Sequence, residues 1–176
     1  MAWRSNLDGW NSTEEYGSGG AVRLEQWVRP PGLVVELSEE GALALGRGYW
    51  LEVESFTHRL VRARQRRGVL ELRLFGRWTL LRFGDPEAAA DESGAFSRFP
   101  IVGGLLARRP GGSITFAQTV RPALELRATV DGFFPRLNGR PGRPVWTGAL
   151  YLQVERRLHT EISHRYFTRM IREAKP

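Results

Sequence analysis

Between Ala21 and Val130, hydrophobic and polar residues alternate or form short apolar runs that Gly and Pro interrupt. Runs of this length between such breakers are typical of β-strands. The pattern predicts eight strands, at Val22–Val28, Leu33–Leu37, Gly48–Thr57, Arg59–Gln65, Val69–Phe75, Trp78–Phe83, Ser113–Val120 and Leu124–Val130.

Two features of these runs predict an antiparallel sheet with one solvated face. In the segment VLELRL, Leu70, Leu72 and Leu74 share one face, while Glu71 and Arg73 share the other. This period of two is typical of antiparallel strands that are wet on a single side. Several connections have only two or three residues, too few for a crossover helix, so we expect hairpins. These connections are Arg66-Arg67-Gly68, Gly76-Arg77 and Arg121-Pro122-Ala123.

The pattern weakens between Gly84 and Gly112. Residues 85–91 (DPEAAAD) fit a short helix or a polar loop. Residues 95–107 contain an apolar stretch with the pair Gly103-Gly104, which indicates a bulge or the close approach of another segment.

One long amphipathic helix is predicted near the C-terminus, from about Thr147 to Ile171, after a loop at 135–144 that is rich in Pro and Gly. Its apolar residues recur at spacings of three and four, which is the helical period. They are Tyr151, Val154, Leu158, Ile162, Tyr166 and Met170. We therefore expect a β-rich α+β fold: a strongly curved antiparallel sheet or open barrel of about eight strands, with the helix packed across its mouth or concave face.

The chain of 176 residues is long enough for one domain, which we expect at 21–176, preceded by an arm at 1–20 that ends in Gly17-Ser18-Gly19-Gly20. No apolar run is long enough to span a bilayer, and the first residues contain no secretory h-region. The chain also has no cysteine. These features favour a cytoplasmic protein.

The chain is basic, with a net charge of +7 and a pI near 10.8. Of its 26 basic residues, only Lys175 is a lysine, a bias that a GC-rich genome produces whatever the partner. Acidic residues are interspersed with the arginines, as at Glu125 and Arg127, whereas a nucleic-acid stripe clusters one sign of charge. The charge alone is therefore a weak indication of nucleic-acid binding.

The element order of the last seventy-odd residues resembles the end of the helix-grip (START-like, SRPBCC) superfamily. The resemblance consists of a Gly-rich hairpin at 103–112, the strands Ser113–Val120 and Leu124–Val130, and the long helix with Tyr151, Leu158, Tyr166 and Met170. It implies a domain that holds an apolar or aromatic molecule between sheet and helix, and some members are cyclases or hydrolases. The family has two short helices after its first strand, whereas here Pro30-Pro31-Gly32 leads into another predicted strand, so a lipocalin-like or other calycin-like barrel fits nearly as well.

Candidate acid/base residues lie in the segment 50–58 (WLEVESFTH). On one regular strand, Glu52, Glu54 and His58 would share a face with Trp50 and Phe56. Two carboxylates and an imidazole among aromatics could act as acid/base groups inside a cup, where burial raises a carboxyl pKa. The alternative interpretation is that Leu51 and Val53 face the core and the glutamates lie in water, because unpaired buried carboxylates are costly.

Several further residues are candidates for the lining of a ligand cup. Gln118 follows the face of Phe116, and Arg82 shares a face with Trp78, so each could orient a ligand within an apolar lining. The alternative is a hydrogen bond to a neighbouring strand, or exposure at a strand end. The predicted ligand-binding set is Trp50, Phe56, Trp78, Arg82, Phe116, Gln118 and Tyr151.

No cofactor or metal is predicted. The sequence lacks the GxxxxGK[ST] phosphate loop, a well-placed GxGxxG, the GxSxG elbow and HExxH. Glu155 and His159, at i and i+4, could share a metal, but such pairs are common as solvated helix contacts.

Three functions are consistent with these patterns. The first is binding of a small apolar or aromatic molecule, with cyclase or isomerase chemistry as an extension. The second is a nucleic-acid-binding module in which Arg62, Arg64 and Arg66, in the run Arg62–Arg67, contact phosphates, although such a run also protects an edge strand from aggregation. The third is a protein-interaction or assembly subunit whose arm, with Trp3, Trp10 and Tyr16, docks on a partner.

Overall fold

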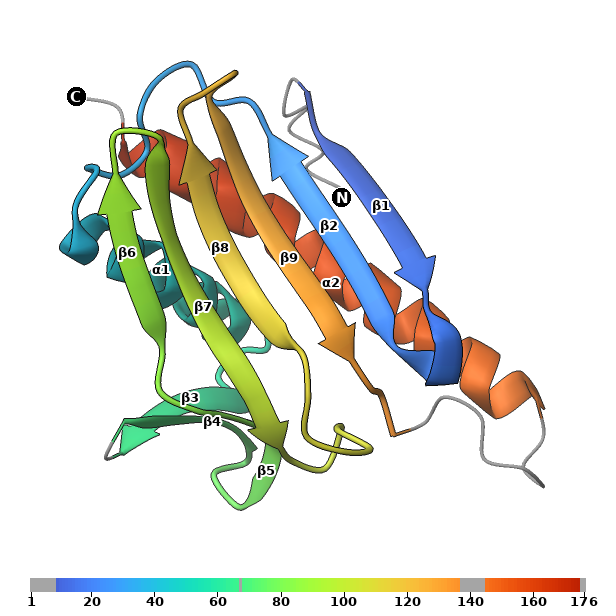
Figure 1. The fold of residues 1–176 in the computed structure, drawn as a ribbon. Helices are drawn as coiled ribbons and strands as arrows, with labels where there is room; N and C mark the ends of the chain where they lie inside the picture. The colour runs from blue at the N-terminus through green and yellow to red at the C-terminus, as the bar shows by residue number, and fades with distance from the viewer. Residues whose placement is uncertain (1–8, 67, 137–144, 175–176) are drawn as a thin grey trace.

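The computed structural model of the chain describes residues 9–66, 68–136 and 145–174, with only the backbone at residue 18 and residues 145–158. Within these residues, nine strands form one antiparallel sheet, and two α-helices lie together on one of its faces (Figure 1). The prediction of a β-rich antiparallel sheet with a C-terminal helix is confirmed.

The strands follow the order β1-β2-β9-β8-β7-β5-β4-β3, and β6 also pairs with β7. Strand β7 joins two parts of the sheet, because β6 pairs with its first half and β5 with its last residues. In Figure 1, β3, β4 and β5 turn away from the other strands at the lower end of the sheet. The strand bounds are β1 Asn11–Tyr16, β2 Val22–Val28, β3 Val61–Arg66, β4 Val69–Leu74, β5 Trp78–Phe83, β6 Glu87–Asp91, β7 Gly94–Gly103, β8 Ser113–Thr119 and β9 Glu125–Phe133.

Six predicted strands and all three predicted hairpins are confirmed. Strand β2 has the predicted bounds, and the short connections join β3 to β4, β4 to β5 and β8 to β9 in antiparallel pairs. On β4, Leu70 and Leu72 are buried while Glu71 and Arg73 lie on the more solvated face. The backbone of Gly104 also approaches β5 closely: a Cβ added at this position would lie 2.4 Å from the carbonyl oxygen of Leu80.

Two predicted strands are wrong. Residues 33–37 form no strand, and Gly48–Thr57 falls within the helix α1, Glu39–Phe56. The hydroxyl of Ser38 caps this helix by accepting a hydrogen bond from the amide of Gly41 at 3.1 Å. Glu39 and Glu40 lie in its first turn, where carboxylates interact favourably with the helix dipole.

Three strands were not predicted. Strand β1 lies in the segment interpreted as an arm and pairs with β2, and β6 occupies the segment interpreted as a short helix or polar loop. Strand β7 contains the apolar stretch around Phe99. The polar composition of β1 and the alanines of β6 concealed these strands. Of the β-branched and aromatic residues that strands favour, β1 has only Thr13 and Tyr16, and β6 has none.

The predicted C-terminal helix is confirmed as α2, Val145–Glu173. The sheet is not closed, since β1 and β3 form its two ends, so the open barrel is not confirmed. Figure 1 shows α2 crossing one face of the sheet beside α1. Over the described residues, neither helix combines the length and the continuous apolar sequence that crossing a bilayer requires.

Aromatic side chains fill the space between the sheet and the C-terminal half of α2. Tyr49 on α1, Phe116 on β8 and Tyr166 on α2 contact one another, with ring centroids 4.5 to 5.8 Å apart. The Tyr166 hydroxyl donates a hydrogen bond to the carbonyl oxygen of Leu45 at 3.1 Å. Here the two helices and the sheet share one closely packed core.

Candidate functional site

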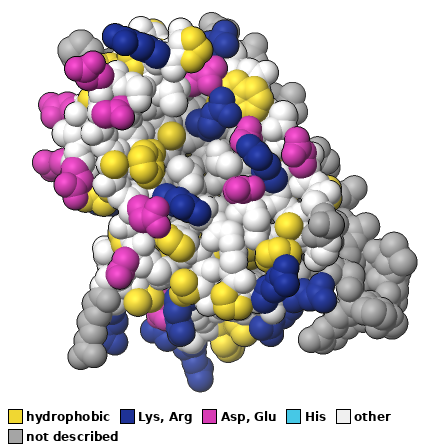
Figure 2. Space-filling model, viewed as in Figure 1, with side chains coloured by type: hydrophobic (Ala, Val, Ile, Leu, Met, Phe, Trp, Pro, Cys, Tyr) yellow, Lys and Arg dark blue, Asp and Glu magenta, His cyan; other side chains and the backbone are white. Residues whose placement is uncertain are grey.

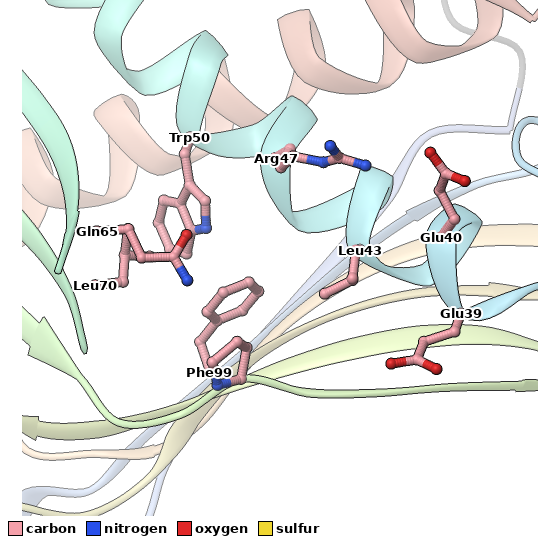
Figure 3. A pocket seen from close by; sticks show the side chains of 9 residues that line it. Glu39, Glu40, Leu43, Arg47, Trp50, Gln65, Leu70 and Phe99 are labelled. Carbon is pink, nitrogen blue, oxygen red and sulfur yellow. The ribbon is translucent and has the colours of Figure 1, made fainter. Parts of the chain in front are cut away.

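A pocket of about 660 Å³ lies along the N-terminal half of α1. The helix forms one wall, and the others come from the hairpin β3–β4, from the segment just before β6 and from β7 (Figure 3). The lining residues are Glu39, Glu40, Leu43, Arg47, Trp50, Gln65, Leu70, Pro86 and Phe99.

Helical spacing brings the α1 residues of this lining to one face. Leu43, Arg47 and Trp50 are separated by four and three residues, so they follow one another along the helix surface. The opposite walls contribute Leu70 and Phe99, both buried and both part of the hydrophobic core. The pocket therefore has an apolar, aromatic base at the edge of the core.

Trp50 contributes an unsatisfied donor to this base. Its side chain is only 6% exposed, and its indole Nε1 has no hydrogen-bond partner among the described residues. In Figure 3, the indole nitrogen and the carboxamide of Gln65 both turn toward the space that Phe99 borders. A buried N–H without an acceptor costs about 1–3 kcal/mol, so an acceptor on a bound molecule would be favourable here. Because its neighbours cover this atom, a ligand reaches it only when one of their side chains moves.

The charged residues of the lining belong to α1. Glu39 and Glu40 stand in the first turn and Arg47 about two turns further on, and all three are exposed. In Figure 3, Leu43 lies between Trp50 and the two glutamates, and the side chain of Arg47 points away from Trp50. The pocket thus combines an apolar base with a charged rim.

The three predicted acid/base residues do not share a face and do not line this pocket. Glu52 is buried against α2, where its Oε1 lies 2.7 Å from Nε of Arg165. The carboxylate of Glu54 accepts a hydrogen bond from the amide of Ala63 at 2.8 Å, which ties α1 to the start of β3. His58 is exposed just after the helix. The strand geometry that would have brought them together is wrong because the segment is helical.

Of the predicted ligand-binding residues, Trp50 lines the pocket. Phe56 is partly buried at the end of α1, and its ring lies 5.5 Å from the guanidinium carbon of Arg165. Phe116 is fully buried in the aromatic core. Tyr151 belongs to α2, but its side chain lies outside the described residues.

Trp78 and Arg82 are exposed, so the prediction that they point inward is wrong. On β5 the buried side chains are Leu81 and Phe83, one position out of phase with the predicted face. Arg82 forms an ion pair with Glu71 on β4, with Nε 3.0 Å from Oε1.

Gln118 is fully buried, as expected, but it holds a backbone segment rather than lining the pocket. Its Oε1 accepts hydrogen bonds from the amides of Val34 and Val35 at 2.6 and 3.1 Å. Its Nε2 donates to the carbonyl oxygen of Val35 at 2.8 Å. The alternative expectation for Gln118, a hydrogen bond to a neighbouring strand, is therefore met in part: the hydrogen bonds exist, but their partners lie in a segment that is not a strand.

The histidines of α2 pack against neighbouring aromatic rings. Nδ1 of His159 lies 3.4 Å from the hydroxyl of Tyr49, and burial raises the pKa of that tyrosine to about 12. Trp10, from the segment interpreted as an arm, packs on His164 and Phe167 with ring centroids 5.5 Å apart. Within the described residues, no three His, Asp or Glu side chains come together as metal ligands; the Glu155 side chain and Trp3 lie outside them.

Most of the pocket was missed by reasoning from the sequence. Its residues come from α1, β3, β4, β7 and the segment before β6, and only Trp50 was proposed in advance. The available signal was the helical spacing of Leu43, Arg47 and Trp50, which the strand assignment obscured.

Comparison with known proteins finds no matching family model, no matching curated protein and no matching solved structure.

Proposed function

We propose that the protein binds a small apolar or aromatic molecule in the pocket between α1, β3–β4 and β6–β7. The observation that carries this proposal is the aromatic base of the pocket, where Trp50 and Phe99 border a space of about 660 Å³. Pockets for small molecules commonly measure about 300–1,000 Å³ and combine apolar walls with a few polar groups.

The chemistry of the lining supports a ligand with one hydrogen-bond acceptor on an apolar body. Leu43, Leu70 and Phe99 offer only apolar contact, and burying apolar surface against them contributes about 25 cal/mol per Å². The indole N–H of Trp50 and the carboxamide of Gln65 are the polar groups closest to this surface in Figure 3. A carbonyl or ether oxygen on the ligand would satisfy the N–H of Trp50.

The proposal is one of binding, without a catalytic step. Glu52 and Glu54 each have a partner outside the pocket, and His58 is exposed after α1. The resemblance to the helix-grip superfamily agrees with a ligand held between sheet and helix. The proposed position nevertheless differs from the cup expected beneath the C-terminal helix, because α1 forms the helical wall.

A direct test is a native mass spectrometry and thermal-shift screen with aromatic metabolites, fatty acids and haem. We expect one chemical class to bind as a one-to-one complex and to raise the melting temperature. The pocket is then filled with Leu43→Trp, and Leu51→Trp serves as the control, since Leu51 is exposed on the same helix. The first variant should lose most of the ligand binding, while the second should keep it.

The polar contact is tested separately with Trp50→Phe, which removes the N–H and keeps an aromatic ring. Ligands with an oxygen acceptor should bind this variant several-fold more weakly, whereas purely apolar analogues should be less affected. Equal binding by Leu43→Trp and the unmodified chain would place the ligand elsewhere, and no binding by any screened class would count against the proposal.

A further inference from the structure

Four large apolar side chains lie exposed at the end of the molecule formed by the β4–β5 turn and the start of the β7–β8 connection. Phe75 and Trp78 are 58% and 50% exposed, and Leu60 and Leu105 are about half exposed. Backbone hydrogen bonds join these segments, from the amide of Phe75 to the oxygen of Leu60 (2.8 Å) and from Leu105 to Thr79 (3.0 Å). We call Leu60, Phe75, Trp78 and Leu105 the apolar tip.

The turn geometry holds the two aromatic rings of this tip outward. Phe75 and Gly76 both have positive φ, 51° and 69°, which makes the reversal between β4 and β5 tight. The rings of Phe75 and Trp78 pack edge to face, with centroids 6.1 Å apart. They cover each other in part and still present apolar surface to solvent.

Arginines surround the apolar tip. Residues 59–82 include eight arginines and one acidic residue, Glu71. The carboxylate of Glu71 is already shared, at 3.0 Å from Arg82 and 3.7 Å from Arg73. Figure 2 shows several Lys/Arg side chains projecting from the lower end of the molecule, beside hydrophobic ones, and most acidic side chains further up.

Three arginines beside the tip have no acidic partner among the residues that the structure describes. Arg59 directly precedes Leu60, and Arg108 lies three residues after Leu105. Arg77 lies between Phe75 and Trp78 in the chain, and its guanidinium carbon is 6.0 Å from the centroid of the Trp78 indole. All three are exposed, and none forms an ion pair with a described residue. Their charge is therefore free to attract an anionic surface.

From these features we propose that the apolar tip and its arginines dock the protein on an anionic lipid surface. A tryptophan and a phenylalanine at a turn, with cations around them, suit the boundary between lipid head groups and acyl chains. Two of the four tip residues are aliphatic, and this composition favours lipid over nucleic acid as the partner. A base stacks on aromatic rings, but Leu60 and Leu105 have neither a π-face nor a hydrogen-bonding group to offer it.

The proposal predicts two contributions to binding that respond to different changes. The arginines contribute an electrostatic attraction that salt screens. The tip contributes apolar burial, which salt does not weaken. Binding should therefore need anionic lipid and fall with salt, and it should also fall when the aromatic side chains are removed at constant charge.

The experiment uses the full chain and vesicles of phosphatidylcholine, with and without phosphatidylglycerol, in a co-sedimentation assay. We expect binding to the anionic vesicles alone at moderate ionic strength. The double variant Phe75→Ser/Trp78→Ser should bind these vesicles more weakly, by a factor of roughly ten or more. The matched control is Leu51→Ser/Phe96→Ser, since Leu51 and Phe96 are also exposed and lie on α1 and near the start of β7.

The charge contribution is tested with Arg59→Gln/Arg77→Gln, against Arg121→Gln/Arg172→Gln as a control with the same change of net charge. The first pair should reduce binding and its salt dependence more than the second. Absence of vesicle binding, or equal losses in the test and control variants, would overturn the proposal. The proposal would also be overturned if the protein bound a single-stranded RNA oligomer and did not bind the vesicles, because the arginines would then be assigned to nucleic acid.

Discussion

Glu52 on α1 and Arg165 on α2 join the two helices through an ion pair, with Oε1 and Nε 2.7 Å apart. The carboxylate is buried, while the guanidinium is about half exposed and lies near the ring of Phe56. This pairing explains why a charged residue occupies the buried face of α1: the arginine neutralises it at the border of the core.

Loss of the arginine should destabilise the fold, because it leaves the buried carboxylate of Glu52 without its counter-ion. We expect Arg165→Met to lower the free energy of unfolding by about 2 kcal/mol, less than for a fully buried pair, since the guanidinium is partly solvated. Urea denaturation measures this change. Arg172→Met, an exposed position on the same helix, should change it by less than about 0.5 kcal/mol; equal effects would contradict a role for the pair.

Gln118 should matter for stability through the segment that it holds. Replacement by Leu removes the acceptor for the amides of Val34 and Val35 and the donor to the oxygen of Val35. We expect Gln118→Leu to lower the free energy of unfolding by about 3 kcal/mol, because each buried group left unpaired costs about 1–3 kcal/mol.

Hydrogen exchange localises this effect of Gln118→Leu. The amides of Val34 and Val35 should exchange much faster in the variant, while those at the centre of β8 and β9 should change only with global stability. Unchanged protection at Val34 and Val35 would show that the segment is held by other contacts.

Strands with one solvated face could be predicted from the sequence because their burial pattern is local. On β4, the alternation of Leu70 and Leu72 with Glu71 and Arg73 follows directly from the two sides of the strand. The helix α2 was likewise predictable, since its apolar stripe extends over many turns.

The segment 50–58 misled prediction because its burial depends on distant residues. Leu51 is exposed and Glu52 buried, the reverse of what hydrophobicity alone suggests. The buried carboxylate is explained by Arg165, more than a hundred residues further along the chain. The pocket also depends on residues that are distant in the sequence, because Gln65, Leu70 and Phe99 come close to Trp50 only when the sheet packs on α1.

The glycines of α1 should be sensitive to substitution, although alanine is the better helix former by about 1 kcal/mol. A Cβ at Gly46 would lie 2.5 Å from Cζ of Phe99, and one at Gly48 would lie 2.7 Å from Sδ of Met170. Gly46 is the more informative site, because an aromatic ring cannot bend away as a methionine can.

We expect Gly46→Ala to lower the free energy of unfolding by about 1–3 kcal/mol through overpacking, outweighing its helix propensity. Gly48→Ala should cost less. Thermal and urea unfolding compare both with Gly32→Ala, where no atom lies within 4 Å of the added methyl group. Stabilisation by Gly46→Ala would mean that α1 lies further from β7 than described.

The free energy of unfolding should depend on pH through His159. Burial lowers the pKa of this histidine below its ordinary value of 6.5, and the carboxylate of Glu14 opposes the effect only in part. As the pH falls through 6.5, the unfolded chain takes up a proton that the folded chain does not, so stability falls until the pH reaches the folded pKa. Between about pH 7.5 and 5, His159→Asn should therefore show a flatter dependence than the unmodified chain in urea denaturation. His58→Asn leaves His159 in place and should keep the steeper slope. Parallel curves for His159→Asn and the unmodified chain would contradict a partly buried, neutral imidazole.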